Sequence, residues 1–363
     1  MSKKPRVMVA MSGGVDSSVA AWLLKEQGYD LIGVTIKTFS DHFFPHDLPP
    51  GTCCSIESAI DARNVAVKLD FPHYMLDLHE LFEKEIIGNF ISEYLAGRTP
   101  NPCVLCNRLV KWGGLLKYAD QFDCEFIATG HYAGIQKFRD RYHIVCGEDA
   151  NKEQSYVLWG LAQEQLKRTM LPIGNLSKTE IRKMAVDAGF TDIAGKPESF
   201  DICFIPDDNY RAFLQKHALD DISSIQEGNF TDADGKILGK HKGYYNYTVG
   251  QRKGLEIALG HRMYVLKIDT ETNTVVLGER PELDSMTMNV GMLNMQKYEA
   301  FPTEKEIKVR VRYKDSGTLA KVKMISENQL AVEFQTPASA VTPGQSAVFY
   351  EDDDLIGGGI ILE

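Results

Sequence analysis

The chain of 363 residues is longer than one hydrophobic core ordinarily fills, so two or three domains are expected. Hydrophobic residues make up 44% and charged residues 25% of it, as in soluble globular proteins, and no run approaches the roughly 18 apolar residues that cross a bilayer. The net charge of −10 argues against a protein that coats nucleic acid, although it leaves room for a local basic face.

The cysteines favour thiol chemistry over a structural disulfide framework. There are seven of them, an odd number that includes the adjacent pair Cys53 and Cys54. Residues 1–5 lead into an apolar strand without the core of a signal peptide, so a cytoplasmic location is expected.

An anion-binding loop is predicted close to the N-terminus. The apolar residues 7–10 are followed by Ser12-Gly13-Gly14-Val15-Asp16-Ser17-Ser18 and then by a helical apolar pattern, which predicts a strand, a tight loop and a helix start. Glycine lets the backbone approach a ligand, and the first N–H groups of a helix attract anions. Serine hydroxyls can donate as well. An ordinary glycine-rich turn between a strand and a helix is the alternative.

The loop does not have the lysine or the spacing of a Walker P-loop. Ser-Gly-Gly-x-Asp-Ser instead resembles the pyrophosphate loop of enzymes that split ATP into AMP and pyrophosphate. The resemblance implies that Asp16 is catalytic and lies near Mg²⁺ and the phosphates. It also implies that the nucleotide is bound by Ala10, Met11, Ser12, Gly13, Gly14, Val15, Asp16 and Ser17.

Short apolar runs alternate with helical patterns from residue 5 to residue 135. Strands are expected at 7–10, 31–36, 73–76 and 126–129, and helices around 15–27, 56–69, 78–95 and 107–119. This alternation predicts an α/β fold with a doubly wound parallel sheet, whose ligands bind beyond the carboxyl ends of the strands. Ile36 and Gly130 follow two such ends. Ile36 alone would be assigned to the core, but the pyrophosphate-loop resemblance implies that it packs on the adenine and that Gly130 approaches it.

Two further segments contain cysteines that suit chemistry. Cys103 and Cys106 follow two prolines and precede a helix that is expected to begin near Asn107, and a thiolate at a helix N-terminus is stabilised by the dipole. Cys203 lies in an apolar run that looks like a strand, where a cysteine is usually buried as a small hydrophobic residue.

The pattern changes after residue 208. Turn signals and short runs predict a small central module at 209–284, and short strands predict a β-barrel at 285–363, so residues 1–208 form the first domain. Basic and apolar residues alternate over 308–314, which predicts a strand with one cationic face. Such a face suits either plain solvation or a phosphate backbone.

The motifs occur in the order found in the bacterial family of tRNA-specific 2-thiouridylases, which the chain therefore resembles. They are the phosphate loop and residues 100–107, 128–132, 151–156, 202–205, 247–255, 311–313 and 343–345. The resemblance implies an enzyme with a sulfurtransferase activity that adenylates the C2 oxygen of the wobble uridine with ATP and Mg²⁺. Sulfur from a cysteine persulfide then displaces AMP and gives 2-thiouridine.

Roles follow from the resemblance position by position. Cys203 would carry the persulfide, and Cys106 would complete the transfer and leave a disulfide between the two residues. The expected partners are tRNAs of the Lys, Glu and Gln type and a persulfide donor of a desulfurase relay, with the enzyme a monomer. Residues at the flipped target base or on the tRNA would be Asn101, Pro102, Cys103, His131, Lys152, Glu153, Gln154, Arg312, Tyr313 and Gln345. Taken alone, His131 is equally explained as a core histidine.

Cys103 departs from the family, in which many members have aspartate at this position. With Cys106 and Cys203 it makes three thiolates, the number that holds a [4Fe–4S] cluster with an open iron in other tRNA thiolases. The persulfide route without metal ligands is the main hypothesis. Two rival functions stay open: a different adenylating ligase, which needs neither Cys106 nor Cys203, and a noncatalytic RNA-binding or redox module, which releases no AMP or pyrophosphate.

Overall fold

The computed structural model describes residues 4–40, 56–196, 202–205, 209–257, 260–302 and 305–362. They form two compact units. Unit 1 comprises residues 1–86, 103–208 and 353–355, and unit 2 comprises 87–102, 209–352 and 356–363. The three-domain division at 208 and 284 stays a prediction, and its first domain includes 87–102, which cluster here with unit 2. Cys53 and Cys54 lie outside the described residues.

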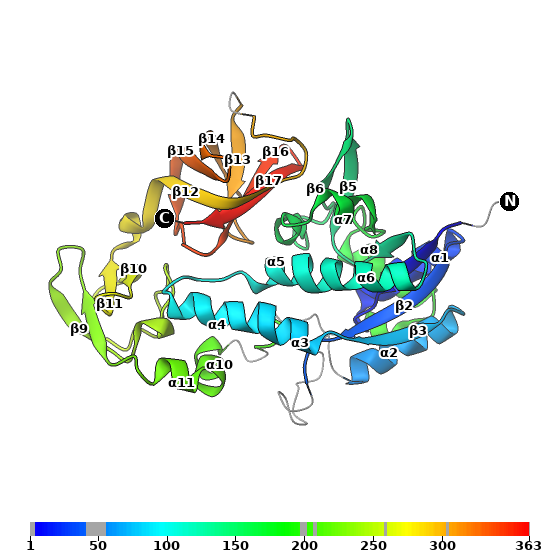
Figure 1. Ribbon diagram of the computed structural model, residues 1–363, viewed down its shortest axis with the longest axis horizontal. Coiled ribbons are helices and arrows are strands. Elements are labelled where there is room, and N and C mark those ends of the chain that lie inside the picture. The colour runs from blue at the N-terminus through cyan, green and yellow to red at the C-terminus, as the bar shows by residue number, and fades with distance from the viewer. Residues whose placement is uncertain are drawn as a thin grey trace. The chain divides into compact units, whose positions relative to one another are not determined.

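A parallel sheet forms the core of unit 1 (Figure 1). Its order is β3-β2-β1-β4-β7, and the central strand β1 pairs in parallel with β2 and β4. Val7, Met8 and Val9 are all fully buried, as expected of a strand that is covered on both faces. The four predicted strands are confirmed. The bounds are β1 (Arg6–Ala10), β2 (Asp30–Lys37), β3 (His73–Asp77), β4 (Phe126–Ala128) and β7 (Thr169–Met170).

Helices pack on the sheet through apolar faces. Val7 and Val9 join one hydrophobic cluster with Val19 of α1, Ala62 of α2 and Ile181 of α8. Helix α6 packs against β4. The helical segments up to residue 194 are α1 (Val15–Glu26), α2 (Ile56–Lys68), α3 (His79–Phe82), η1 (Glu83–Ile87), α4 (Gly88–Leu95), α5 (Pro102–Cys106), η2 (Asn107–Trp112), α6 (Gly113–Gln121), η3 (Ser155–Leu158), α7 (Gln163–Lys167), α8 (Lys178–Asp187) and α9 (Thr191–Ala194); the hairpin strands are β5 (Ala133–Phe138) and β6 (Arg141–Cys146).

Two local predictions are wrong. The helix that was expected to begin near Asn107 begins at Pro102, because proline fits the first helical position, where its missing N–H is not needed. Residues 202–205 form a turn rather than a strand, since the N–H of Ile205 donates to the carbonyl of Ile202 (3.0 Å). Cys103 therefore lies in the first helical turn, and Cys106 lies at the end of α5.

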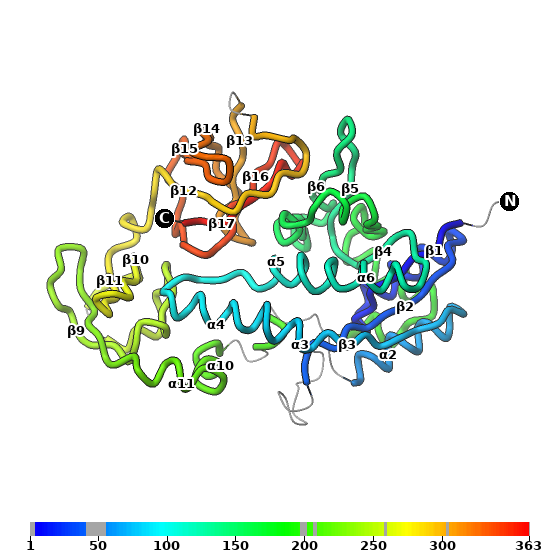
Figure 2. The backbone as a smooth tube through the Cα atoms, viewed as in Figure 1, coloured from blue at the N-terminus to red at the C-terminus, as the bar shows by residue number. Residues whose placement is uncertain are grey.

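The C-terminal strands close into the predicted β-barrel, which the orange and red tube of Figure 2 follows. The strand order is β12-β15-β14-β13-β16-β17, and Val290 of β12 pairs with both Leu330 and Ile361, which closes the ring. Val309, Phe334 and Phe349 are among the buried residues that fill it. The barrel strands are β12 (Asp284–Met295), β13 (Ile307–Arg310), β14 (Thr318–Ser326), β15 (Gln329–Ser339), β16 (Ser346–Glu351) and β17 (Asp354–Ile361).

A four-stranded sheet precedes the barrel in unit 2, in the order β10-β11-β8-β9. Phe230 packs at its centre, edge to face with His241 (5.3 Å between ring centroids) and Tyr247 (5.1 Å). The remaining elements are α10 (Tyr210–His217), α11 (Leu219–Ile222), β8 (Gly228–Thr231), β9 (Ile237–His241), η4 (Tyr244–Asn246), β10 (Tyr264–Asp269), β11 (Thr274–Gly278) and η5 (Arg280–Leu283).

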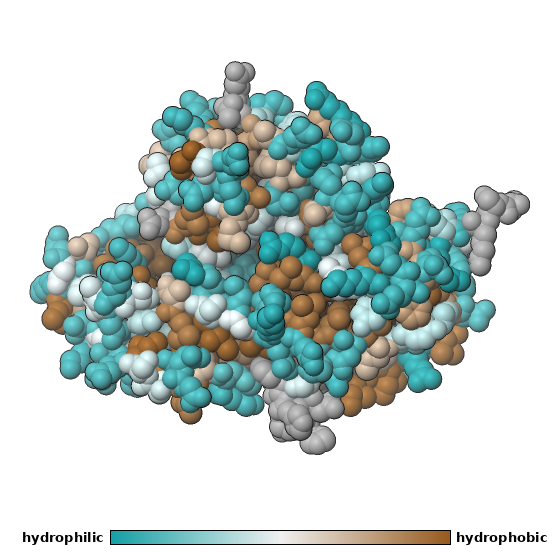
Figure 3. Space-filling view, viewed as in Figure 1, coloured by the Kyte–Doolittle hydropathy of each residue, from teal (hydrophilic) through white to brown (hydrophobic). Residues whose placement is uncertain are grey.

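Hydrophilic side chains cover most of the face shown in Figure 3, with smaller hydrophobic patches between them. Among the described residues, no helix has the length and apolar content that a membrane crossing requires.

A carboxylate in unit 2 should make the protein sensitive to acid. Desolvation opposes ionisation of Glu351, but hydrogen bonds from Lys297, Lys305 (2.5 Å) and Tyr298 (2.7 Å) lower its pKa from 4.5 to about 2. A lowered carboxyl pKa stabilises the fold above pH 4.5, and this stabilisation is lost as the pH falls toward 2. We expect Glu351→Gln to cost about 2 kcal/mol at pH 7 and much less at pH 2.5, as measured by urea unfolding at each pH. An equal cost at both pH values would contradict this assignment.

Candidate active site

The loop after β1 is held in one shape by its own hydroxyl groups. Gly14 precedes the first residue of α1, and its carbonyl accepts from the hydroxyls of Ser17 (3.2 Å) and Ser18 (2.9 Å). The N–H of Ser12 donates to the Ser17 hydroxyl (3.2 Å). Gly13 has a φ of +73°, and a Cβ there would lie 2.2 Å from the carbonyl oxygen of Ser58. The sequence therefore needs glycine at this position for both conformation and space.

This loop lies where the strand order of the sheet reverses. Strand β1 continues through α1 to β2 on one side, whereas β4 lies on its other side. Loops that leave a parallel sheet at such a point diverge and open a crevice at the carboxyl ends of the strands. Ala10, Met11 and Ile36 all lie at or just after these ends, and Met11 is buried with its N–H donated to the carbonyl of Val34 (2.8 Å).

Gly130, in the loop after β4, packs directly against the first turn of α1. A Cβ at this position would lie 2.7 Å from the backbone carbon of Asp16 and from the backbone nitrogen of Ser17. Backbone cannot yield to such a contact as a flexible side chain can. The two loops at the switch point are thus in contact through a glycine.

Replacing Gly130 with alanine should therefore distort the start of α1. We expect a loss of about 1–3 kcal/mol in the free energy of unfolding and weaker ATP binding, both measurable by thermal unfolding with and without ATP. Gly195→Ala is the control, because a Cβ built there has no atom within 4 Å among the described residues beyond its chain neighbours. Equal melting temperatures and equal ATP-induced shifts in the two variants would contradict the close packing at Gly130.

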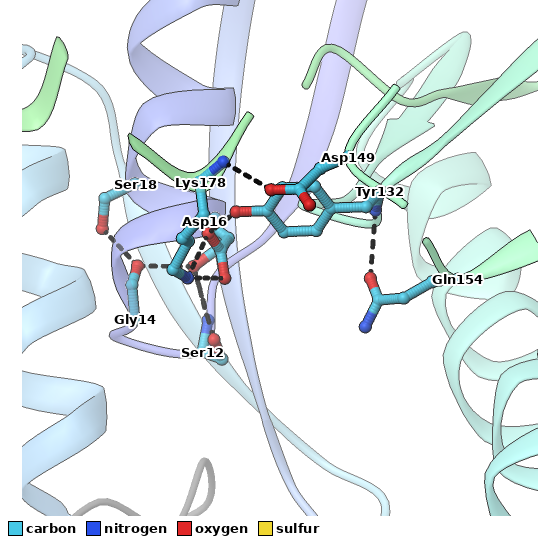
Figure 4. A network of polar contacts seen from close by, with 9 residues as sticks. Ser12, Gly14, Asp16, Ser18, Tyr132, Asp149, Gln154 and Lys178 are labelled. Carbon is cyan, nitrogen blue, oxygen red and sulfur yellow. Dashed lines mark hydrogen bonds and ion pairs between the residues drawn. The ribbon is translucent and has the colours of Figure 1, made fainter. Parts of the chain in front are cut away.

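Asp16 is the polar centre of the site (Figure 4). Its carboxylate accepts a hydrogen bond from the Tyr132 hydroxyl (2.6 Å) and pairs with the ammonium group of Lys178 (2.8 and 2.9 Å). The side chains are largely shielded from water, with 32% of Asp16 and 14% of Lys178 exposed. Lys178 is the first residue of α8, whose start is fixed by reciprocal hydrogen bonds between Ser177 and Glu180. The first turns of α1 and α8 thus meet at one ion pair.

The segment 149–154 lies beside this ion pair. The Asp149 carboxylate accepts from the backbone N–H groups of Lys178 (2.9 Å) and Asn151 (3.0 Å). The side-chain carbonyl of Gln154 accepts from the backbone N–H of Tyr132 (3.0 Å), and the backbone N–H of Gln154 donates to the Tyr132 carbonyl (2.9 Å). Asp149 therefore holds Lys178, and Gln154 holds Tyr132, so this segment fixes both side chains that contact Asp16.

Lys152 and Glu153 belong to the same segment. The backbone N–H of Lys152 donates to the Asp149 carbonyl (2.9 Å), and the Glu153 carboxylate accepts from the backbone N–H of Ser155. The backbone of the segment is thus ordered by its own hydrogen bonds.

His131 follows Gly130 and is half-buried. One ring nitrogen lies 2.7 Å from the Thr129 hydroxyl, and the ring packs against Trp112 (5.5 Å between centroids). Burial and, next, the charge of Lys111 lower the pKa of His131 well below its ordinary value of 6.5. His131 is therefore neutral at physiological pH and is suited to hydrogen bonding rather than to pairing with a phosphate.

The cysteine pair of α5 lies immediately before a π-helical stretch, η2, a feature often found at functional sites. Asn107, the first residue of η2, is 2% exposed and donates its side-chain amide to the carbonyl of Val157 (2.9 Å). This bond anchors the end of α5, and with it Cys106, to the segment that follows Gln154. Cys203 is held differently, because its neighbour Phe204 packs edge to face on Phe82 (5.8 Å).

Cys103, Cys106 and Cys203 are thiols of intermediate exposure. Throughout the described ranges, no cluster of three or more His, Cys, Asp or Glu side chains could hold a metal ion. The three cysteines therefore do not fit the ligand set of a [4Fe–4S] cluster in this arrangement.

Other residues singled out from the sequence lie in unit 2. The Gln345 side chain donates to the carbonyls of Thr99 and Pro100 (3.0 Å each), and the N–H of Thr99 donates to the carbonyl of Pro343 (2.9 Å). These bonds attach residues 99–100 to the barrel, and the chain continues directly from them into Asn101 and Pro102. The side-chain nitrogen of Gln345 is thus engaged with the protein itself.

Arg312 and Tyr313 do not lie on a strand, so the predicted cationic strand over 308–314 is too long. Strand β13 ends at Arg310, because Asp315 accepts from the backbone N–H groups of Val311 (3.0 Å) and Gly317 (3.1 Å) and bends the chain. Arg312 and Tyr313 are exposed in this turn. The Arg310 guanidinium stacks on the Tyr350 ring (4.5 Å).

Three residues of the site, Tyr132, Asp149 and Lys178, are not predicted by the sequence. Tyr132 lies inside one of the predicted motifs, but no local pattern reveals the partner of its hydroxyl. Ser177-Lys178-Thr179-Glu180 carries the signal of a helix start, since serine followed three residues later by glutamate forms a capping box. Nothing local, however, links Lys178 to Asp16, 162 residues away, or to Asp149.

Comparison with known proteins covers nearly the whole chain. Family models match a tRNA methyl transferase HUP domain at residues 5–207, a tRNA methyl transferase PRC-barrel domain at 212–279 and an aminomethyltransferase beta-barrel domain at 287–361. The tRNA-specific 2-thiouridylase MnmA of Cytophaga hutchinsonii is 49% identical over 99% of this chain and 98% of its own. The protein of the same name from Salinibacter ruber is 50% identical over 100% and 96%, and that from Halothermothrix orenii is 46% identical over 99% of each chain.

Proposed function

The chain belongs to the tRNA-specific 2-thiouridylase family and is a tRNA sulfurtransferase, and from this premise we propose that it makes 2-thiouridine at the wobble position in an ATP-dependent reaction. The observation that carries the proposal is the sequence identity of 46–50% to three relatives of that name over nearly the whole chain. Two of the family models are described as tRNA methyl transferase domains, but each of them matches a single domain. The 2-thiouridylase relatives match the whole chain, so the function is assigned from them.

ATP would bind across the switch point of the sheet. The backbone N–H groups of Gly13 and Gly14 and the Ser12 hydroxyl suit the pyrophosphate portion, together with the positive end of α1, while the Ser17 hydroxyl holds the shape of the loop. Ile36, half-buried at the end of β2, suits the adenine. The nucleotide site thus consists of Ala10, Met11, Ser12, Gly13, Gly14, Val15, Asp16, Ser17, Ile36 and Gly130.

The Asp16 carboxylate, at the first turn of α1, is a donor of the kind that Mg²⁺ prefers. Asp16 and the phosphates of ATP would hold the ion, which would neutralise charge on the departing pyrophosphate. Lys178, on the same carboxylate, adds a fixed positive charge beside the phosphate loop. Charge stabilisation of this kind is the main contribution that a protein makes to a reaction at phosphorus.

Adenylation solves a chemical problem of the uracil ring. Its C2 carbonyl is a poor electrophile with a poor leaving group, and attack of the C2 oxygen on the α-phosphate releases pyrophosphate and turns that oxygen into part of AMP. The terminal sulfur of a Cys203 persulfide then attacks C2, and AMP leaves. The Cys106 thiolate attacks the γ-sulfur of Cys203, which breaks the S–S bond and leaves sulfur on C2. The resulting Cys106–Cys203 disulfide needs two electrons from an external thiol for the next turnover.

The binding of tRNA would use both units. Asn101, Pro102 and Cys103 would lie beside the flipped base, and His131, neutral by burial, would offer a hydrogen bond. Further contacts are assigned to Lys152, Glu153, Gln154, Arg312, Tyr313 and Gln345. The sulfur would arrive from a persulfide donor protein of a desulfurase relay, the substrates would be tRNAs of the Lys, Glu and Gln type, and the enzyme would act as a monomer in the cytoplasm.

The exposed arginine of the turn after β13 gives a direct test of RNA contact. Arg312→Glu should weaken tRNA binding and reduce the slope of log affinity against log salt by about 1–2, while ATP affinity stays unchanged. The matched control is Lys242→Glu, since the Lys242 ammonium is already paired with Glu256 (3.3 Å). Equal tRNA affinities of the Arg312→Glu variant and the wild type in low salt would remove this turn from the RNA site.

Mass spectrometry of nucleosides tests the proposed function as a whole. The tRNA is incubated with enzyme, ATP, Mg²⁺ and a persulfide donor, digested, and searched for 2-thiouridine with AMP formed in equal amount. A ligase of another kind would release AMP without thiolated tRNA, and a binding module would release no AMP. Either result would refute the proposal.

A further inference from the structure

Residues 149–154 of unit 1 hold both partners of the Asp16 carboxylate. The Asp16 carboxylate has two partners that come from distant parts of the chain, Tyr132 and Lys178. Each of these is held by a different residue of the same short segment, through Gln154 on one side and Asp149 on the other. Figure 4 shows the two chains of hydrogen bonds converging on Asp16.

The first chain passes through Tyr132. Gln154 fixes both backbone polar groups around this tyrosine, by accepting from its N–H (3.0 Å) and donating to its carbonyl (2.9 Å). Tyr132 is only 3% exposed, so its ring has little freedom to move independently of the backbone. A displacement of Gln154 is therefore transmitted to the hydroxyl that lies 2.6 Å from Asp16.

The second chain passes through the start of α8. Asp149 accepts from the backbone N–H of Lys178, the residue whose ammonium pairs with Asp16. The same carboxylate closes a turn with the N–H of Asn151, so its position depends on the conformation of the segment. The Lys178 ammonium also lies over the Tyr132 ring (5.7 Å from the centroid), which brings the two chains into contact.

We propose that residues 149–154 are a positioning element through which tRNA contact sets the geometry of Asp16 and so promotes adenylation. The proposal rests on the function proposed above, in which Lys152–Gln154 touch tRNA. The proposal gives a role to three residues whose sequence context reveals none: Asp149, Tyr132 and Lys178. The consequence for the enzyme is that Asp16, Tyr132 and Lys178 reach the geometry that adenylation needs when tRNA contacts this segment.

The decisive measurement is a double-mutant cycle on AMP formation. Kinetics are recorded at saturating ATP, with tRNA affinity determined separately so that every variant is compared at saturating tRNA. Gln154→Ala should lower kcat about tenfold, because a hydrogen bond that orients a partner of a charged group is lost. In the Tyr132→Phe background, where the hydroxyl is absent, the same change should lower kcat by less than about twofold. Equal, multiplicative effects in both backgrounds would overturn the proposal, since Gln154 would then act independently of Tyr132.

Asp149 tests the second chain without a proposed tRNA contact. Asp149→Ala should lower kcat for AMP formation about tenfold at saturating tRNA, with tRNA affinity unchanged within about twofold. Glu148→Gln is the neighbouring control, and it should retain the wild-type kcat. A lower melting temperature with an unchanged kcat per folded enzyme would show a purely structural role and overturn the proposal.

Failure of the inference can be told apart from failure of the function. If the wild type forms no AMP when tRNA is added, the proposed function is wrong. If the wild type forms AMP with tRNA and the Asp149→Ala and Gln154→Ala variants form it with the same kcat, only the positioning role is wrong.

Discussion

Asp16→Asn should reduce the rate of tRNA-dependent adenylation by about 10²–10³-fold, equivalent to roughly 3–4 kcal/mol of transition-state stabilisation. Asparagine keeps the shape and can still accept from Tyr132, but it loses the charge that pairs with Lys178 and that would bind Mg²⁺. The rate is measured by ATP–pyrophosphate exchange in the presence of tRNA.

Two comparisons make this prediction specific. Asp120→Asn removes a surface ion pair with Arg168 in the same unit and should leave the rate within about twofold of the wild type. Lys178→Met should lower the rate substantially, and combining it with Asp16→Asn should add little, because the two residues act as a pair. Near-normal exchange by Asp16→Asn would remove this carboxylate from the mechanism.

The phosphate loop and the sheet could be predicted from sequence because their signals are local. Val7, Met8 and Val9 form a buried run that ends at Ser-Gly-Gly, and the next residues show a helical period, so strand, loop and helix follow one another without help from distant residues. The backbone at Gly13 has a positive φ, which favours glycine. A glycine in a tight loop already indicates this conformation in the sequence.

The errors arose where one residue or one hydrogen bond overrules a local pattern. Two prolines in close succession suggest a loop, yet proline is favoured at the first position of a helix, so the helix N-terminus predicted for Cys106 is in fact occupied by Cys103. The alternation of basic residues continues past Arg310, but the Asp315 carboxylate captures the N–H of Val311 and ends the strand. A short polar side chain can compete in this way with the hydrogen bonds between neighbouring strands.

The side chains that pair with Asp16 could not be predicted, although the ends of β1 and β4 were expected to converge on the nucleotide. Lys178 and Tyr132 reach Asp16 from two other loops of the sheet. No helical or strand periodicity in the sequence relates either residue to Asp16. Only the topology of the sheet, which brings the ends of β1 and β4 together with the start of α8, makes them neighbours.

Cys106→Ser and Cys203→Ser should each abolish turnover to 2-thiouridine while release of pyrophosphate from ATP persists, because adenylation precedes any chemistry at sulfur. The two variants should differ in what accumulates. Without Cys203 no persulfide reaches the base, so no sulfur is found on tRNA. Without Cys106 the base remains joined to Cys203 through a disulfide, which mass spectrometry detects as a protein–RNA adduct that a small thiol releases as 2-thiouridine.

Cys124→Ala is the control for these cysteine variants. Burial raises the pKa of the Cys124 thiol to about 11, so it stays protonated and unreactive at neutral pH, and its removal should leave thiolation intact. A loss of pyrophosphate release in the Cys106 and Cys203 variants would contradict the order of the two steps.

Cys103 decides between the persulfide route and an iron–sulfur cluster. Its place in the first turn of α5 stabilises a thiolate, which makes it available either to the target base or to a metal. The persulfide route predicts that Cys103→Ala retains thiolation within about tenfold, since Cys106 and Cys203 complete the chemistry without it. A cluster enzyme, purified without oxygen, would be brown, contain about four iron atoms per chain and lose all thiolation on Cys103→Ala. On the persulfide route, we expect a colourless protein that is fully active with a persulfide donor.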